Sequence, residues 1–130
     1  RMTRFWITID QGVSFVLRCI DLMRGGEVFV PKVPSMRVVD LARTLAPECD
    51  IEVIGIREGE KLHEVLIHAD EARRTLDADN FFVIMPERSL IRLDGWDHAR
   101  PLPPGFVYAS DTNDQWLTKR QMAEMIASCL

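Results

Sequence analysis

The sequence predicts a small α/β domain in which short strands alternate with helices around a small sheet. Its 130 residues are enough for one domain with a hydrophobic core of its own. Hydrophobic residues make up 47% of the chain and charged residues 28%, the balance of a globular protein. Apolar residues recur along the chain at strand and helix spacing in turn, in the order β-α-β-α-β-α-β-α. This alternation predicts a layered α/β arrangement within a single domain, residues 1–130.

The first strand is predicted at residues 4–9, which are rich in aromatic and β-branched side chains. A helix follows, for which Asp10 is the predicted N-terminal cap. The apolar side chains of this helix recur at helical spacing: Val13, Val16, Leu17 and Ile20. Gly25 and Gly26 are expected to end the helix. The next strand is then "EVFVP", residues 27–31, ended by its proline.

A second helix is expected after residue 35, ending before Pro47. Its apolar face consists of Val38, Leu41, Ala42 and Leu45. The run "DIEVIGI", residues 50–56, then predicts a strand, and a short helix is predicted for residues 62–67 after a charged turn.

The polar residues 68–80 are predicted to be irregular, and the run "FFVIM", residues 81–85, predicts a buried strand. Residues 86–117, rich in proline and glycine, are expected to form an extended surface segment. The last helix is predicted at residues 118–130. Thr118 and Gln121 have the spacing of a capping box there, ahead of an apolar stripe of Met122, Met125, Ile126 and Cys129.

Charge and cysteine content narrow the class of protein. A formal net charge of −4 argues against nucleic-acid binding, although a few arginines can still bind a small anion. The cysteines Cys19, Cys49 and Cys129 lack metal-type spacing and predict buried, reduced thiols in a cytoplasmic protein. No membrane span or signal peptide is expected. Because the sequence opens on Arg1 and a predicted strand, we expect it to be a piece of a longer protein.

Motifs that would indicate catalysis or metal binding fail on their spacing. His63 and His68 are five residues apart, whereas zinc-protease helices place the second histidine four residues after the first. We expect no metal site, and His63 to make local contacts only. The sequence contains neither a Gly-rich phosphate loop nor a nucleophile elbow. Tyr108 has threonine, not lysine, four residues later. We therefore predict no catalytic residue in this chain.

The charged turn after residue 56 has two interpretations. It carries Arg57, Glu58, Glu60 and Lys61 around one glycine. A solvated turn is one explanation. The other is an anion site, since an arginine beyond the end of a strand lies where open α/β sheets bind ligands, and its planar fork suits phosphate oxygens. Glu60 then accepts hydrogen bonds from sugar hydroxyls or orients Arg57. Arg1 and Arg4 are further basic candidates, and Arg4 has a salt bridge to Asp10 as its structural alternative.

Four separated motifs resemble one enzyme family. They are "RMTRFWIT", "GGEVFVPKVPSMRVVDLA", "IGIREGEKLHEVLI" and "DTNDQWL". Together they are similar to the C-terminal part of the soluble, inverting UDP-N-acetylglucosamine 4,6-dehydratases, which belong to the extended short-chain dehydrogenase/reductases. The resemblance covers nearly the whole chain. It implies the substrate-binding part of such an enzyme, without the Rossmann half that carries NADP and the catalytic residues.

The resemblance also implies a reaction for the intact enzyme. Hydride passes from C4 of the sugar to NADP, water is lost across C5 and C6, and the hydride returns to C6 while C5 is reprotonated on the opposite face. The implied ligand is UDP-N-acetylglucosamine, the implied role bacterial surface polysaccharide synthesis and the implied assembly a homo-oligomer. Arg57 corresponds to the family arginine that reaches UDP and Glu60 to its substrate-contacting glutamate. Arg4, Lys61 and Arg1 are further candidates, and the isolated chain is expected to be inactive.

One departure and two alternatives remain at this point. The family usually has proline where this sequence has Glu58, which we expect to face solvent. In "DTNDQWL" we interpret Asn113 and Asp114 as turn and cap residues, and Trp116 as a contact for the last helix. The alternatives to the dehydratase are a stand-alone nucleotide-sugar binding module and an assembly domain that uses exposed Met122 and Trp116.

Overall fold

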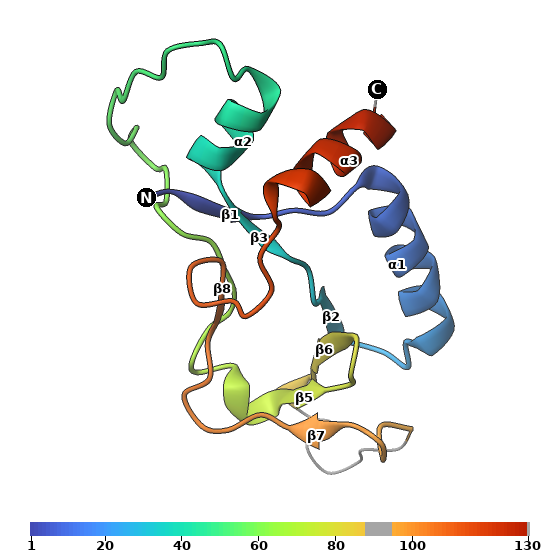
Figure 1. Cartoon of the computed structure of the whole chain (residues 1–130). Helices are drawn as coiled ribbons and strands as arrows, with labels where there is room; N and C mark the ends of the chain where they lie inside the picture. The colour runs from blue at the N-terminus through green and yellow to red at the C-terminus, as the bar shows by residue number, and fades with distance from the viewer. Residues whose placement is uncertain (88–94, 130) are drawn as a thin grey trace. The chain divides into compact units, whose positions relative to one another are not determined.

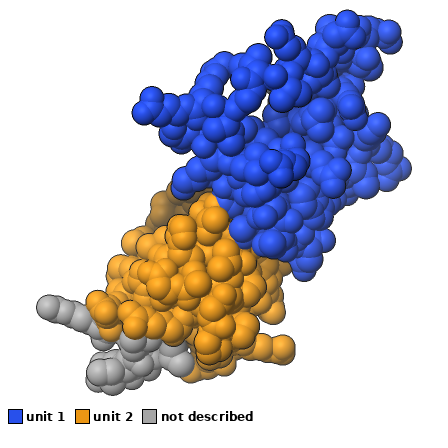
Figure 2. Space-filling view, turned by 90° about the vertical axis from the view of Figure 1, so that its left-hand side faces the viewer, with its two compact units in different colours: residues 1–8, 33–64, 109–130 blue, residues 9–32, 65–108 orange. Residues whose placement is uncertain are grey.

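The computed structural model describes residues 1–87 and 95–129, with the side chain of Cys129 left aside. Residues 88–94 of the predicted surface segment and Leu130 of the predicted last helix lie outside the described residues. The described part combines helices with short strands, and the predicted α/β class is confirmed. The chain divides into two compact units: residues 1–8, 33–64 and 109–130 form unit 1, and residues 9–32 and 65–108 form unit 2 (Figure 2).

Unit 1 is built on a pair of short strands and two helices. β1 (Thr3–Phe5) pairs antiparallel with β3 (Ser35–Arg37) (Figure 1). α2 (Val38–Leu45) follows β3 directly and packs against α3 (Lys119–Cys129). The predicted α2 and its end before Pro47 are confirmed, whereas the first strand is shorter than residues 4–9.

The start of α3 has the predicted capping box. The Thr118 backbone N–H donates to Gln121 Oε1 at 2.9 Å, and the Gln121 N–H donates to Thr118 Oγ1 at 3.3 Å. Met122 in the first turn is only 2% exposed. The assembly hypothesis was therefore wrong in treating Met122 as exposed, because this side chain forms part of the unit's core.

Unit 2 contains a four-stranded antiparallel sheet in the order β2-β6-β5-β7. The strands are β2 (Val28–Pro31), β6 (Phe81–Ile84), β5 (Thr75–Asp77) and β7 (Arg100–Pro101). The single-turn 3₁₀ helix η1 (Ala72–Arg74) leads into β5. β5 shows that the prediction of irregular structure for residues 68–80 was wrong. β5 is only three residues long, which is too short to give a clear strand pattern in the sequence.

The predicted strand "FFVIM" is confirmed as β6, and it is buried on both faces. Phe81 and Val83 contribute to a cluster with Leu76 and Trp96, while Phe82 packs on the other side against the Tyr108 ring at 5.1 Å between centroids. A strand that is covered on both faces needs a continuous apolar run, and this run was the clearest strand signal in the sequence.

Helix α1 (Ile9–Leu22) is confirmed, but its contacts differ from the simple stripe in the sequence. Phe15 and Leu22 pack against the unit 2 core, whereas the predicted apolar face is 54–59% exposed at Val13, Val16, Leu17 and Ile20. Asp10 lies inside the first turn and not at the cap, where a carboxylate still favours the helix dipole.

Two further predictions around the charged turn were wrong. No strand forms at residues 50–56, which are exposed, with Val53 90% exposed and Gly55 at a positive φ of 86°. The predicted helix at residues 62–67 is replaced by β4 (Val65–Ile67), which pairs with β8 (Tyr108–Ala109). Six residues are too few to distinguish helical from strand spacing.

The described parts of residues 86–117 contain core side chains as well as surface ones. Trp96 and Tyr108 are buried in unit 2, and Asn113 is buried in unit 1. The prediction of buried thiols was wrong for Cys49, which is exposed, and Cys19 is half-buried. Burial raises the pKa of the Cys19 thiol despite the nearby Arg18 cation, so the thiol form is favoured there.

Candidate functional site in unit 1

The charged turn is closed by its own carboxylate. The Glu60 backbone N–H donates to the Arg57 carbonyl at 3.1 Å, and Glu60 Oε2 accepts the Arg57 backbone N–H at 3.1 Å. Gly59 has a φ of +79°, a conformation that glycine adopts without strain. Glu60 therefore orients Arg57 through the backbone, which was one of the two roles expected of it.

The remaining charges of the turn are exposed. Arg57, Glu58 and Lys61 all lie at the surface, as does Arg1. None of these four takes part in the ion pairs found among residues 1–87 and 95–129. The Arg57 guanidinium is thus available to an anion from solution, and Glu58 is solvent-exposed as expected.

Arg4 holds the backbone that follows the turn. Its two terminal nitrogens donate to the carbonyls of Lys61 at 2.9 Å and Leu62 at 3.3 Å. Its Nε lies 3.5 Å from Glu64 Oε1. Within unit 1, Glu64 is thus a carboxylate partner of Arg4. Arg4 is a candidate site residue whose donors are already occupied by the protein.

Behind the turn, His63 is linked to two buried hydroxyl groups. His63 Nδ1 lies 2.8 Å from Thr3 Oγ1, which in turn lies 2.6 Å from Ser110 Oγ. Ser110 Oγ also accepts the Glu64 backbone N–H at 2.9 Å. On the other side of the ring, His63 Nε2 lies 3.9 Å from Asp111 Oδ2. The expectation of local contacts on a helix face was wrong, because His63 lies on irregular chain and its hydrogen-bond partner Thr3 is 60 positions away.

Asn113 of the "DTNDQWL" motif joins its own segment to residues 33–35 of unit 1. Its side-chain amide donates to the Val33 carbonyl at 2.9 Å, to Ser35 Oγ at 3.0 Å and to the Gln115 carbonyl at 3.1 Å. The Trp116 indole N–H donates to the Asn113 carbonyl at 2.7 Å. The residue is a buried structural centre, a role that sequence reasoning missed because its partners lie 78 and 80 positions away.

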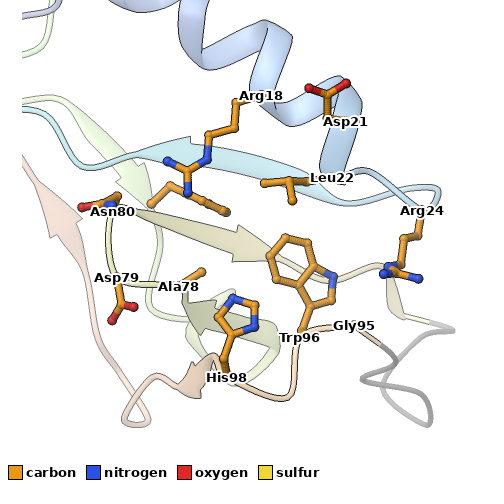
Figure 3. Close-up of a pocket in the computed structure, with 11 residues that line it drawn as sticks. Arg18, Asp21, Leu22, Arg24, Ala78, Asp79, Asn80, Gly95, Trp96 and His98 are labelled. Atoms are coloured by element: carbon orange, nitrogen blue, oxygen red, sulfur yellow. The ribbon is translucent and has the colours of Figure 1, made fainter.

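Unit 2 contains a pocket of about 280 Å³ between α1 and the β5–β6 turn (Figure 3). Phe81 and Trp96 line it, with Arg18 5.1 Å above the Phe81 ring. The volume is below the range of about 300–1,000 Å³ that is typical of ligand pockets. Asp21 and Asp79 on its lining offset the charges of Arg18 and Arg24, which leaves little net attraction for a diphosphate. This pocket is therefore a poorer nucleotide site than the turn of unit 1.

Neither a metal-binding cluster nor a membrane-spanning helix is present among the described residues. No group of three or more metal-binding side chains lies together in this part of the chain. In the same residues, no helix combines the length and the apolar character that crossing a bilayer requires.

Comparison with known proteins assigns the family. The profile described as "Polysaccharide biosynthesis protein" matches residues 1–86. The chain belongs to this family. It is also 41% identical to a UDP-N-acetylglucosamine 4,6-dehydratase (inverting) of Campylobacter jejuni, over 97% of the chain and 40% of the relative. The predicted resemblance to these dehydratases is thereby confirmed.

Two further relatives extend the comparison. A UDP-glucose 4-epimerase of Rickettsia bellii is 32% identical over 64% of the chain and 26% of the relative. The X-ray structure of Pen from Bacillus thuringiensis superposes with a TM-score of 0.82 at 26% identity, over 98% of the chain and 39% of Pen. This polysaccharide biosynthesis family member thus spans about 40% of the length of the curated dehydratases that it matches.

Proposed function

We propose that this chain is the UDP-sugar binding part of a UDP-N-acetylglucosamine 4,6-dehydratase that inverts C5. The observation that carries the proposal is the Arg57 turn, which Glu60 closes through its carboxylate while the guanidinium stays exposed. Arginine binds the oxygens of a diphosphate with paired, charge-assisted hydrogen bonds. The name of the Campylobacter relative supplies the sugar, and the epimerase relative also carries a UDP-hexose in its name.

The turn supplies binding, and the redox chemistry is assigned to a different part of the intact enzyme. The chain contains no Gly-rich loop for a dinucleotide pyrophosphate, so its residues do not fit NADP. The proposal includes NADP as the cofactor of the intact lyase, a cytoplasmic location, a homo-oligomeric assembly and a role in bacterial surface polysaccharide synthesis. The isolated chain is then a binding part without dehydratase activity.

The contributions of the candidate residues differ under this proposal. Arg57 contacts the diphosphate, and Lys61 and Arg1 add exposed positive charge. Glu60 fixes the turn through Oε2 and contacts the sugar. Arg4 acts on the backbone of residues 61 and 62 rather than on the ligand.

The test is a titration of the protein with UDP-N-acetylglucosamine, followed by amide NMR and calorimetry. Replacing Arg57 with alanine should weaken binding about 10- to 100-fold, the loss expected for charge-assisted hydrogen bonds. Arg73→Ala is the matched control, because this side chain is 75% exposed in unit 2 and its nearest carboxylate, on Glu87, lies 4.0 Å away. Equal affinities for the two variants would refute the role of Arg57. Dispersed wild-type spectra without shifts at millimolar ligand would refute a preformed site.

A further inference from the structure

We infer that β1 and residues 109–111 hold residues 61–64 in place as the seat of the Arg57 turn. Within this arrangement, the structure assigns His63 as a neutral positioning residue with its proton on Nε2. The effect on ligand binding rests on the proposed function. The arrangement of the seat and the tautomer of His63 do not, so they can be tested without a ligand.

The first observation is that residues 61–64 are bonded on two sides by unit 1. From β1, the Thr3 N–H donates to the Leu62 carbonyl at 3.0 Å. From the other side, the Ser110 N–H donates to the Glu64 carbonyl at 2.8 Å, and Ser110 Oγ accepts the Glu64 N–H at 2.9 Å. The chain therefore leaves the exposed turn and at once enters a segment in which the carbonyls of Leu62 and Glu64 and the Glu64 N–H are hydrogen-bonded within unit 1.

The second observation is that the Arg4 guanidinium also binds the backbone of this segment. It donates to the carbonyls of Lys61 and Leu62 and lies beside the Glu64 carboxylate. A lysine at this position carries one compact ammonium and lacks the planar fork that reaches both carbonyls and the carboxylate. The geometry is that of a positioning arginine.

The third observation sets the direction of the hydroxyl chain. Ser110 is 0% exposed, so the hydrogen of its hydroxyl needs a protein acceptor. Because Ser110 Oγ already accepts the Glu64 N–H, its hydrogen goes to Thr3 Oγ1, and the Thr3 hydrogen goes to His63 Nδ1. In the opposite direction, His63 donates from Nδ1, Thr3 donates to Ser110, and the Ser110 hydrogen has no acceptor among the described residues.

The direction of these hydrogen bonds determines the tautomer of His63. A neutral histidine that accepts at Nδ1 carries its hydrogen on Nε2. Asp111 is a charged group beside the ring, with its Oδ2 3.9 Å from Nε2. The Nε2–H dipole then faces Asp111, which favours the same tautomer. Removing the Thr3 hydroxyl leaves Nδ1 without its donor and Ser110 without its acceptor.

The experiment starts with the ligand-free protein. Two-bond ¹H–¹⁵N correlations of the His63 ring, recorded with the ring in its neutral form, should show the proton on Nε2. Thr3→Val should shift the ring toward the Nδ1–H tautomer and move the amide resonances of residues 57–64, whereas Thr3→Ser should leave both as in wild type. A wild-type ring with its proton on Nδ1 would overturn the inference, and so would equal spectra of the two Thr3 variants.

Ligand titration then tests the consequence for binding. Thr3→Val should weaken binding of UDP-N-acetylglucosamine about tenfold, as one buried hydrogen bond is lost, and Thr3→Ser should restore it. If Thr3→Val fails to fold, His63→Asn and His63→Leu replace it, because the asparagine Oδ1 preserves an acceptor for the Thr3 hydroxyl. Equal affinities within such a pair would refute the positioning role. A wild-type protein that binds no ligand would refute the proposed function. The tautomer measurement would still test whether residues 61–64 are held as inferred.

Discussion

Asn113 offers the most direct test of how unit 1 is held together. Its side chain is 7% exposed and donates to the Val33 carbonyl at 2.9 Å and to Ser35 Oγ at 3.0 Å. Its third contact, the Gln115 carbonyl, also accepts the Ser35 backbone N–H at 2.8 Å. Alanine at position 113 therefore removes the amide donor from the buried Ser35 Oγ and from the Val33 carbonyl.

The magnitude follows from the lost amide donor. Losing a buried hydrogen bond costs about 1–3 kcal/mol, so Asn113→Ala should lower the free energy of unfolding by about 1–3 kcal/mol. This is a large share of the ~5–15 kcal/mol of a typical domain. Asn113→Asp should destabilise at least as much, because a carboxylate of the same shape then faces the Val33 carbonyl with no hydrogen to donate.

Urea denaturation followed by circular dichroism measures this change. The linear dependence of the unfolding free energy on urea converts the shift in midpoint to a free-energy difference. The matched control is Asp114→Ala, an exposed neighbour in the same motif, which should change stability by less than about 0.5 kcal/mol. An Asn113→Ala midpoint equal to that of the control would refute the structural role of Asn113.

Two further predictions concern α3 and the turn before β2. Thr118→Ala removes the capping box with Gln121 and should cost about 0.5–2 kcal/mol in urea denaturation, whereas Thr118→Ser should not. Burial opposes the charge of Glu27, but backbone N–H donors, including those of Arg24 and Gly25, outweigh it and lower the pKa. Its stabilisation is therefore present above the unfolded pKa of about 4.3 and is lost as pH falls through the lower folded value. Between neutral and acid pH, the unfolding free energy measured in urea should fall less for Glu27→Gln than for the wild type. An equal fall in the two proteins would contradict this.

The sequence predicted best where one local signal determines the structure. β6 was predicted from its apolar run, and the α3 start from the spacing of Thr118 and Gln121. Both signals are physical requirements of the element itself. A strand covered on both faces needs apolar side chains throughout, and the first N–H groups of a helix need nearby acceptors.

Prediction failed where a partner segment decides the outcome. Residues 50–56 have strand-like composition, yet a strand needs a neighbour with which to exchange hydrogen bonds, and none is formed there. In contrast, β4 is recognisable only through its pairing with β8. The stripe of α1 was visible in the sequence, but nothing local distinguished the side chains that meet the unit 2 core, such as Phe15, from those left exposed, such as Leu17.

The candidate site divides in the same way. Arg57 and Glu60 stand out in the sequence because their charges surround a single glycine. The roles of Arg4 and His63 could not be predicted from the sequence, because these hydrogen-bond partners lie 57, 58 and 60 positions away. Composition cannot show that Arg4 holds carbonyl groups while Arg57 is exposed. Arg4 meets these carbonyl groups only because β1 and the segment at Ser110 pack against residues 61–64.

The formal charge of the turn shows why geometry must decide between a solvated turn and an anion site. Arg57 and Lys61 carry two positive charges, and Glu58 and Glu60 carry two negative charges, so the turn as a whole attracts an anion little. The structure separates the four groups. The Glu60 carboxylate accepts the Arg57 backbone N–H, and the arginine side chain is exposed beside a segment that hydrogen bonds within unit 1 hold in place. Such an arginine loses little conformational freedom of its backbone on binding, so most of its charge-assisted hydrogen bonding contributes to affinity. Under the proposed function this arrangement favours an anion site over a solvated turn, and the titration of the Arg57→Ala variant distinguishes the two.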